Sequence, residues 1–239
     1  MKIKIHFTTY IMFLLCLLAG FGYELLIVFF SIIFHELSHV VASKIFKKKV
    51  HRITILPFGG IFEVKDNQNV SLLEEFIIIL AGPVGSFFLL QFESLYQINI
   101  IILLFNILPI YPLDGGRLLE TTLCRFIKFR TVLRVVFITS LLSSSLLLYY
   151  GTVNNSINIV LISVVLLYIN YQNLKNVEIK YWTFLNDKVL FKRQLPIKSH
   201  DNVNLKNIYR GFNNIFMDNG KIVTENQLIK SLNFKDYMI

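Results

Sequence analysis

The stretch from Ser31 to Phe46, SIIFHELSHVVASKIF, places a metal-binding motif inside an apolar segment. His35 and His39 are four residues apart, so both imidazoles project from one face of a helix and can bind one zinc ion. Glu36 beside them can act as the general base for water attack. If the segment begins near residue 24, His35 lies about 16 Å along the helix, near the middle of a hydrocarbon core about 30 Å thick. A zinc site is therefore expected at the depth of the membrane interior; a hydrogen-bonded histidine pair between helices would leave Glu36 unexplained.

The composition of the whole chain indicates a membrane protein. Of the 239 residues, 54% are hydrophobic and only 16% are charged, whereas soluble domains carry about 25% charged residues. Six apolar stretches approach or exceed bilayer length, and they cover residues 6–21, 24–46, 74–92, 98–124, 131–150 and 157–173. We therefore predict an α-helical polytopic membrane protein of about six transmembrane helices.

Lysine and arginine are distributed asymmetrically around these stretches. They follow the second stretch, lie between the fourth and the fifth, and follow the sixth, whereas the three opposite connections contain neither residue. Because basic loops stay on the cytoplasmic side, both termini are predicted to be cytoplasmic in a bacterial cell membrane. The alternative is that the first stretch does not cross the membrane.

Residues 50–64, VHRITILPFGGIFEV, are β-branched and aromatic around a Pro-Phe-Gly-Gly turn, which predicts a short hairpin. This hairpin is either a simple connector or a strand edge that receives a substrate in extended form.

The composition changes near Leu174, where Asn and Lys increase. We divide the chain into a transmembrane domain that carries the metal motif, 1–173, and a linker with a small cytosolic α/β segment, 174–239. Helices are predicted over about 205–212 and 226–232, with the strand GKIVTE between them. This tail resembles one half of a CBS (cystathionine-β-synthase) domain, a nucleotide-sensing module, which implies nucleotide binding and pairing in a homo-oligomer. The alternative is a generic small tail.

The fourth apolar stretch contains a candidate for the third metal ligand. A catalytic zinc site uses three protein ligands and keeps one position open. Asp114 lies in FNILPIYPLDGGRLLE, where Pro109 and Pro112 interrupt the helix. Non-helical backbone at membrane depth is tolerated where it is buried in protein or lines a wet cavity, so Asp114 can complete a His-His-Asp site. The Asn106 amide either binds the backbone of an extended substrate or hydrogen-bonds a neighbouring helix.

The paired motifs resemble the site-2 protease family of intramembrane zinc metalloproteases, through His35-Glu36-x-x-His39 and Asn106-x-x-Pro109-x-x-Pro112-Leu113-Asp114-Gly115. AGPVGS at residues 81–86 and the CBS-like tail resemble its sporulation stage IV factor B branch. The resemblance implies cleavage near the cytosolic face, with release of a sigma factor from its membrane-bound pro-form. It also implies roles for individual residues: zinc ligation by His35, His39 and Asp114, general-base catalysis by Glu36, and substrate positioning by Asn106 and Pro112.

The function expected from these features is that of a zinc-dependent intramembrane endopeptidase acting on a membrane-tethered protein. Inhibitory membrane proteins are further partners that the resemblance implies, and no partnership with nucleic acid is expected. The alternative is a membrane zinc or proton transporter that uses the same ligands around a broken helix. A pseudoprotease that only binds partners is a third interpretation. The glutamate beside the histidine pair and the lack of a repeat relating the two halves favour the hydrolase.

Overall fold

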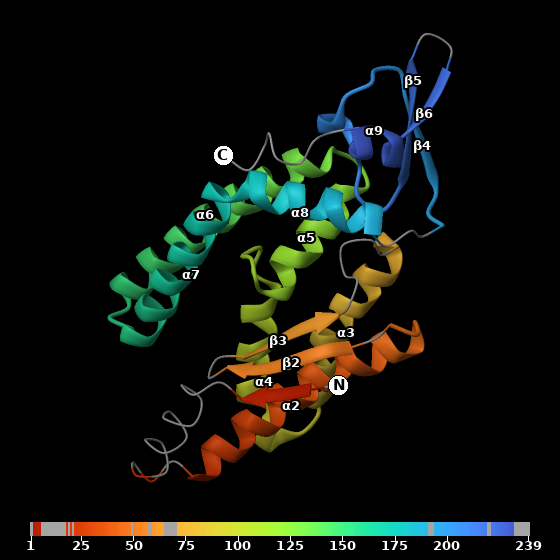
Figure 1. The fold of residues 1–239 in the computed structure, drawn as a ribbon. Helices are drawn as coiled ribbons and strands as arrows, with labels where there is room; N and C mark the ends of the chain where they lie inside the picture. The colour runs from red at the N-terminus through yellow and green to blue at the C-terminus, as the bar shows by residue number, and fades with distance from the viewer. Residues whose placement is uncertain are drawn as a thin grey trace. The chain divides into compact units, whose positions relative to one another are not determined.

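The computed structural model describes residues 2–5, 18, 20, 22–48, 50–56, 59–64, 71–190, 194–218 and 221–231. Figure 1 shows the elements in chain order, from β1 to α9. The chain forms two compact units. The N-terminal unit comprises residues 1–67, 74–108 and 113–115, and the C-terminal unit comprises residues 68–73, 109–112 and 116–239.

The helices of the N-terminal unit are α2 (Gly22–Ile45), α4 (Glu93–Ile107) and, from residue 74 onward, α3 (Leu72–Leu89). Helix α2 has Glu24 in its first turn and Lys44 in its last turn, and both charges complement the helix dipole. Its interior contains neither Gly nor Pro, so the apolar run that surrounds the histidines continues as one unbroken helix.

A three-stranded sheet accompanies these helices. Strand β1 (Lys2–Ile5) pairs in parallel with β2 (Val50–Leu56), which pairs antiparallel with β3 (Gly59–Val64). The β2–β3 pairing confirms the predicted hairpin, and its turn residues 57 and 58 lie outside the described residues. In the order β1-β2-β3, strand β3 is at an edge of the sheet.

Within the described part of the chain, four helices are long and apolar enough to cross a membrane: α2, α3, α6 (Phe129–Val153) and α7 (Ile157–Lys175). They match the second, third, fifth and sixth predicted spans. The fourth predicted span is interrupted as expected, because the shorter apolar helix α4 ends before α5 (Asp114–Cys124) begins. The first predicted span, 6–21, lies outside the described residues apart from positions 18 and 20.

The C-terminal unit has its own hydrophobic core, to which α6, α8 (Val177–Leu190) and the tail contribute. Helix α8 lies where the sequence predicted a linker. Its residues Tyr181, Phe184 and Leu185 are buried on one side at helical spacing. A 14-residue amphipathic helix is too short and too polar to be detected by a search for apolar stretches of bilayer length.

The tail combines a second sheet with a short helix. Strand β4 (Ile197–His200) is parallel to β5 (Asn213–Asp218), and β5 is antiparallel to β6 (Lys221–Thr224). Helix α9 (Glu225–Ser231) follows β6. The strand and second helix predicted in the tail are therefore confirmed.

The helix predicted over 205–212 is wrong: only Leu205–Asn207 is helical, as the 3-10 turn η2. The backbone of Tyr209 bonds the Asn214 side chain in place of a helical partner. The Tyr209 N–H donates to Asn214 Oδ1 and Asn214 Nδ2 donates to the Tyr209 carbonyl, both at 3.0 Å. Gly211 then takes a left-handed conformation with φ +81, which ends any helical path.

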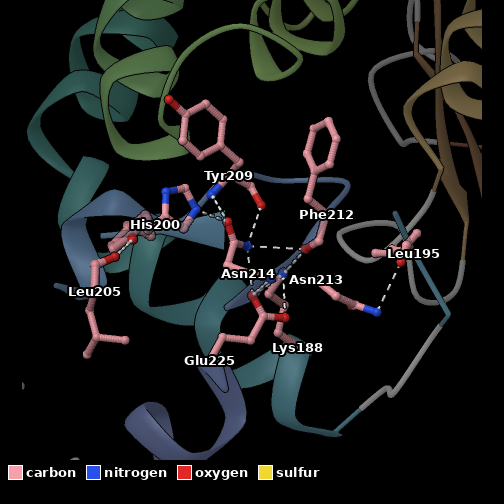
Figure 2. Close-up of polar contacts among 10 residues, drawn as sticks. Lys188, Leu195, His200, Leu205, Tyr209, Phe212, Asn213, Asn214 and Glu225 are labelled. Atoms are coloured by element: carbon pink, nitrogen blue, oxygen red, sulfur yellow. Dashed lines mark hydrogen bonds and ion pairs between the residues drawn. The ribbon is translucent and has the colours of Figure 1, made fainter. Parts of the chain in front are cut away.

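A buried ion pair ties the tail to α8, as Figure 2 shows. Lys188 Nζ donates to both carboxylate oxygens of Glu225 at 2.7 Å and to the Phe212 carbonyl at 2.6 Å. Burial lowers the pKa of Lys188, because desolvation of the ammonium outweighs the attraction of Glu225. Glu225 also accepts hydrogen bonds from the backbone and the side chain of Asn214, so the carboxylate is held by several donors.

Candidate metal centre

Helix α2 carries its polar residues on the buried side. Ser31, His35 and His39 follow one another at intervals of four residues and are almost completely buried. Large apolar side chains of the same helix are exposed, among them Phe30, Leu37 and Val41. This is the arrangement expected of a membrane helix that turns its costly polar groups towards protein and its apolar groups towards lipid.

Both histidines face the carboxylate of Asp114, the first residue of α5. Asp114 Oδ2 lies 3.1 Å from His35 Nε2 and 3.2 Å from His39 Nε2. All three residues belong to the N-terminal unit, and their exposed fractions are 3%, 2% and 6% for His35, His39 and Asp114. One potential ligand atom from each residue lies within 4.8 Å of the others, which is close enough for one ion to bind all three.

Helix α3 fixes the orientation of the two imidazoles through their remaining nitrogens. His39 Nδ1 lies 2.8 Å from the Ile78 carbonyl oxygen, and His35 Nδ1 lies 2.8 Å from Ser86 Oγ. A carbonyl oxygen only accepts hydrogen bonds, so His39 Nδ1 carries the proton and the neutral imidazole has its lone pair on Nε2. Second contacts of this kind hold metal-binding histidines in the correct tautomer.

The chemistry of this donor set fits a divalent metal. With its proton on Nδ1, His39 directs an Nε2 lone pair at a carboxylate oxygen that also only accepts hydrogen bonds. Two acceptors held together in a buried site need a proton or a cation between them. Two imidazole nitrogens and one carboxylate oxygen form the ligand combination of catalytic zinc sites, in which a fourth position stays open.

Close packing of α3 on α2 depends on glycine. A Cβ atom at Gly82 would lie 2.3 Å from His39 Nε2 and 2.7 Å from His35 Nε2, so any side chain there would occupy the space beside the two imidazole nitrogens that face Asp114. At Gly85 the same atom would lie 2.1 Å from Ser38 Oγ. Glycine at both positions lets the two helices approach, as small residues do in membrane helix pairs.

The other predicted site residues lie outside the His-His-Asp group. Glu36 is on α2 beside His35 and is 9% exposed. Asn106, near the end of α4, donates from Nδ2 to the Ile102 carbonyl at 3.0 Å within its own helix. Pro112 is exposed and lies in the connection between α4 and α5. The substrate-positioning roles of Asn106 and Pro112 stay predictions.

Several residues that shape the site escaped sequence reasoning. Gly82 and Ser86 entered the sequence analysis only through the resemblance of AGPVGS, and neither they nor the Ile78 carbonyl had a predicted role at the site, although small residues at helical spacing are a detectable signal of close packing. Asn99 of α4 is completely buried and donates at 2.9 Å to Ser31 Oγ, one turn before His35 on α2. A polar Asn side chain within an apolar stretch is the signal that could have identified this contact.

An apolar helix with His-Glu-x-x-His, joined by a buried carboxylate from a second helix, defines the class of membrane-embedded metallopeptidases. The chain belongs to Peptidase family M50, whose family model matches residues 23–92 and 88–149. This confirms the predicted membership of the site-2 protease family. The protein is accordingly an integral membrane protein, with helices α2, α3, α6 and α7 of membrane-crossing length.

Individual relatives agree with this assignment. The chain is 35% identical to Stage IV sporulation protein FB of Bacillus subtilis over 156 residues, which are 59% of this chain and 54% of that protein. It is 26% identical to a zinc metalloprotease of Methanocaldococcus jannaschii over 83% of this chain and 65% of that protein. Both matches cover less than two thirds of the relative's length.

The fold is also similar to a solved structure, titled Site-2 Protease from Methanocaldococcus jannaschii. The TM-score is 0.58 at 24% sequence identity, over 72% of this chain and 90% of that chain. The likeness supports a mostly helical membrane fold of the site-2 protease type.

Proposed function

We propose that this protein is a zinc-dependent intramembrane endopeptidase that cleaves a membrane-tethered protein substrate. The observation that carries the proposal is the convergence of two imidazole nitrogens and one carboxylate oxygen in a buried site, with Glu36 next to the first histidine. Membership of Peptidase family M50 supports the same activity.

In this proposal, His35 Nε2, His39 Nε2 and Asp114 Oδ2 hold the zinc ion. A bound zinc ion would supply Lewis acidity, which polarises a peptide carbonyl and makes water acidic enough to lose a proton near neutral pH. Glu36 accepts a proton from the attacking water and passes it to the amine nitrogen as the peptide C–N bond breaks. The hydrogen bond to Ile78 keeps His39 in the tautomer that offers its Nε2 lone pair.

The substrate is proposed to bind in extended form, because a helical peptide bond is shielded by its own backbone hydrogen bonds. Strand β3 is at an edge of its sheet, and an edge strand can pair with a further extended segment. Asn106 and Pro112 are the residues proposed to orient the unwound chain. The Lys and Arg residues that follow the second apolar stretch favour the cytoplasmic side for this hairpin, so we propose cleavage near the cytosolic face.

The wider biological setting belongs to the same proposal. The name of the relative from Bacillus subtilis assigns that protein to sporulation. We extend this to a sigma factor in its pro-form as the substrate, inhibitory membrane proteins as regulators, and cytoplasmic termini. Residues 1–173 would form the protease domain, and residues 174–239 a CBS-like segment that binds nucleotide and pairs in a homo-oligomer.

The test is co-expression of the full chain with candidate membrane-tethered transcription factor precursors, followed by purification in detergent and cleavage of the same substrates. We expect cleavage in cells, loss of the purified activity when a chelator removes the metal, and recovery when zinc is added back. Zinc flux into protein-containing vesicles, with no cleavage of any tethered substrate, would favour the transporter instead. A protein that binds substrate and zinc but never cleaves would be a pseudoprotease.

A further inference from the structure

The broken segment between α4 and α5 contains one residue whose backbone is held from two sides. The Tyr111 N–H donates to Ser140 Oγ at 2.9 Å, and the Tyr111 carbonyl accepts from Asn170 Nδ2 at 2.6 Å. Pro109 and Pro112 have no N–H group, so this segment cannot complete a helical ladder. At membrane depth such backbone groups need partners from other elements.

The two partners come from different helices and are both completely buried. Ser140 is on α6 and also donates to the Val136 carbonyl in its own helix at 2.7 Å. Asn170 is on α7, and its amide also donates to the Leu166 carbonyl at 2.9 Å. The second bonds lock the rotamers of both side chains, so they present a fixed acceptor and a fixed donor to the Tyr111 backbone.

The start of α5 rests directly on this clamped backbone. A Cβ atom at Gly116 would lie 2.5 Å from the Tyr111 nitrogen and 2.5 Å from the Ile110 carbonyl carbon. Gly116 is therefore in close contact with the backbone that Ser140 and Asn170 hold. It lies in the first turn of α5, two residues after Asp114, and the helix makes the two positions rigid relative to each other.

We infer that Ser140 and Asn170 are positioning residues for the metal centre: by clamping the Tyr111 backbone they fix the start of α5 and hence the direction of the Asp114 carboxylate. The inference rests on the proposed function, in which Asp114 is a zinc ligand. The clamp explains how a carboxylate beside two helix-breaking prolines is held still enough to bind a metal.

The test measures zinc affinity, by competition with a chelator in the purified full chain, for Ser140→Cys, Ser140→Ala and Asn170→Ala. Cysteine is close in size to serine but accepts hydrogen bonds weakly, so it weakens the clamp with little risk to folding. We expect zinc to bind about 10-fold more weakly in the alanine variants, the lower end of the effect of removing outer contacts to a metal site. The loss of zinc affinity should be smaller in Ser140→Cys than in the alanine variants. For substrate cleavage, kcat should fall with little change in KM.

A double-mutant comparison separates positioning from simple destabilisation. In an Asp114→Ala background the clamp has no carboxylate to position, so Ser140→Cys should then leave zinc affinity unchanged. The control is Ser163→Ala: Ser163 is equally buried, and its hydroxyl donates to the Ile159 carbonyl in its own helix. This control should bind zinc as the unaltered protein does. Ser140→Thr keeps the hydroxyl and should restore most of the affinity.

Two results would overturn the inference. One is an unaltered zinc affinity in Ser140→Cys, Ser140→Ala and Asn170→Ala. The other is an equal loss with and without Asp114, which would indicate general destabilisation. Failure of the proposed function would look different, because the unaltered protein would then cleave no substrate, whatever the zinc affinities of the Ser140 and Asn170 variants.

Discussion

His35 Nε2 and Asp114 Oδ2 lie 3.1 Å apart, although 79 residues separate them in the chain. The same carboxylate oxygen lies 3.2 Å from His39 Nε2. A single buried oxygen therefore faces two imidazole nitrogens from consecutive turns of α2. A metal site with three protein ligands at this position would therefore need the Asp114 carboxylate.

Replacing Asp114 tests this dependence. Asp114→Ala removes one of the three proposed ligands, and we expect the purified protein to retain clearly less than one zinc ion per chain. Metal analysis after gel filtration measures the stoichiometry. Glu24→Ala is the matched control, since Glu24 is an exposed acidic residue of the same unit. An unchanged zinc content in Asp114→Ala would show that Asp114 is not a ligand.

Gly82→Ala tests the space beside the ligands. The added methyl group would lie 2.3 Å from His39 Nε2, so the imidazole or α3 must shift. We expect at least about 10-fold weaker zinc binding while the protein remains folded, because the ligand geometry itself is disturbed. Chelator competition measures the affinity. Val84→Ala, at an exposed position of the same helix, should have no effect; a normal affinity in Gly82→Ala would contradict the packing described for α3.

Ser86→Ala tests the contact that orients His35. The hydroxyl lies 2.8 Å from His35 Nδ1, and its loss frees the ring to rotate. Outer contacts of this kind contribute about 10–100-fold to metal affinity, and we expect a loss within that range. Ser38→Ala is the control, because the Ser38 hydroxyl donates to the Phe34 carbonyl within α2. Equal zinc affinities in Ser86→Ala and Ser38→Ala would show that the Ser86 hydroxyl does not support the metal site.

Lys188→Met tests the link between α8 and the tail. It leaves the Glu225 carboxylate buried without its cation. Removing one partner of a buried ion pair lowers the free energy of unfolding by about 3 kcal/mol. Hydrogen exchange in β5 and α9 should therefore become faster. Lys188→Met/Glu225→Gln removes the unpaired charge and should recover part of the protection. Lys230→Met, at an exposed position of α9, is the control. Unchanged exchange in Lys188→Met would contradict a stabilising ion pair.

The sequence was sufficient for the elements whose signals are local. The spacing of His35 and His39 predicts that they share one helix face, and the apolar run around them is long enough to span a membrane. Asp114 could be selected because the prolines before it mark the one interrupted span. Each of these inferences needs only neighbouring residues.

Contacts between distant segments could not be predicted in the same way. His35 and Ser86 are 51 residues apart, and nothing local indicates which hydroxyl an imidazole will face. The helix expected over 205–212 failed because the Asn214 side chain, outside that range, bonds the Tyr209 backbone. Helix α8 was missed because its apolar residues occupy only one face.

The measurement that tests the central claim most directly is cleavage of a membrane-tethered substrate by Glu36→Gln, assayed together with its zinc content. Glutamine is nearly the same size as glutamate but cannot accept the proton from water, so chemistry should stop while the metal site stays intact. We predict no detectable product and one zinc ion per chain, as in the unaltered protein. Cleavage at the unaltered rate by zinc-loaded Glu36→Gln would contradict the assignment of Glu36 as the general base and, with it, the proposed mechanism.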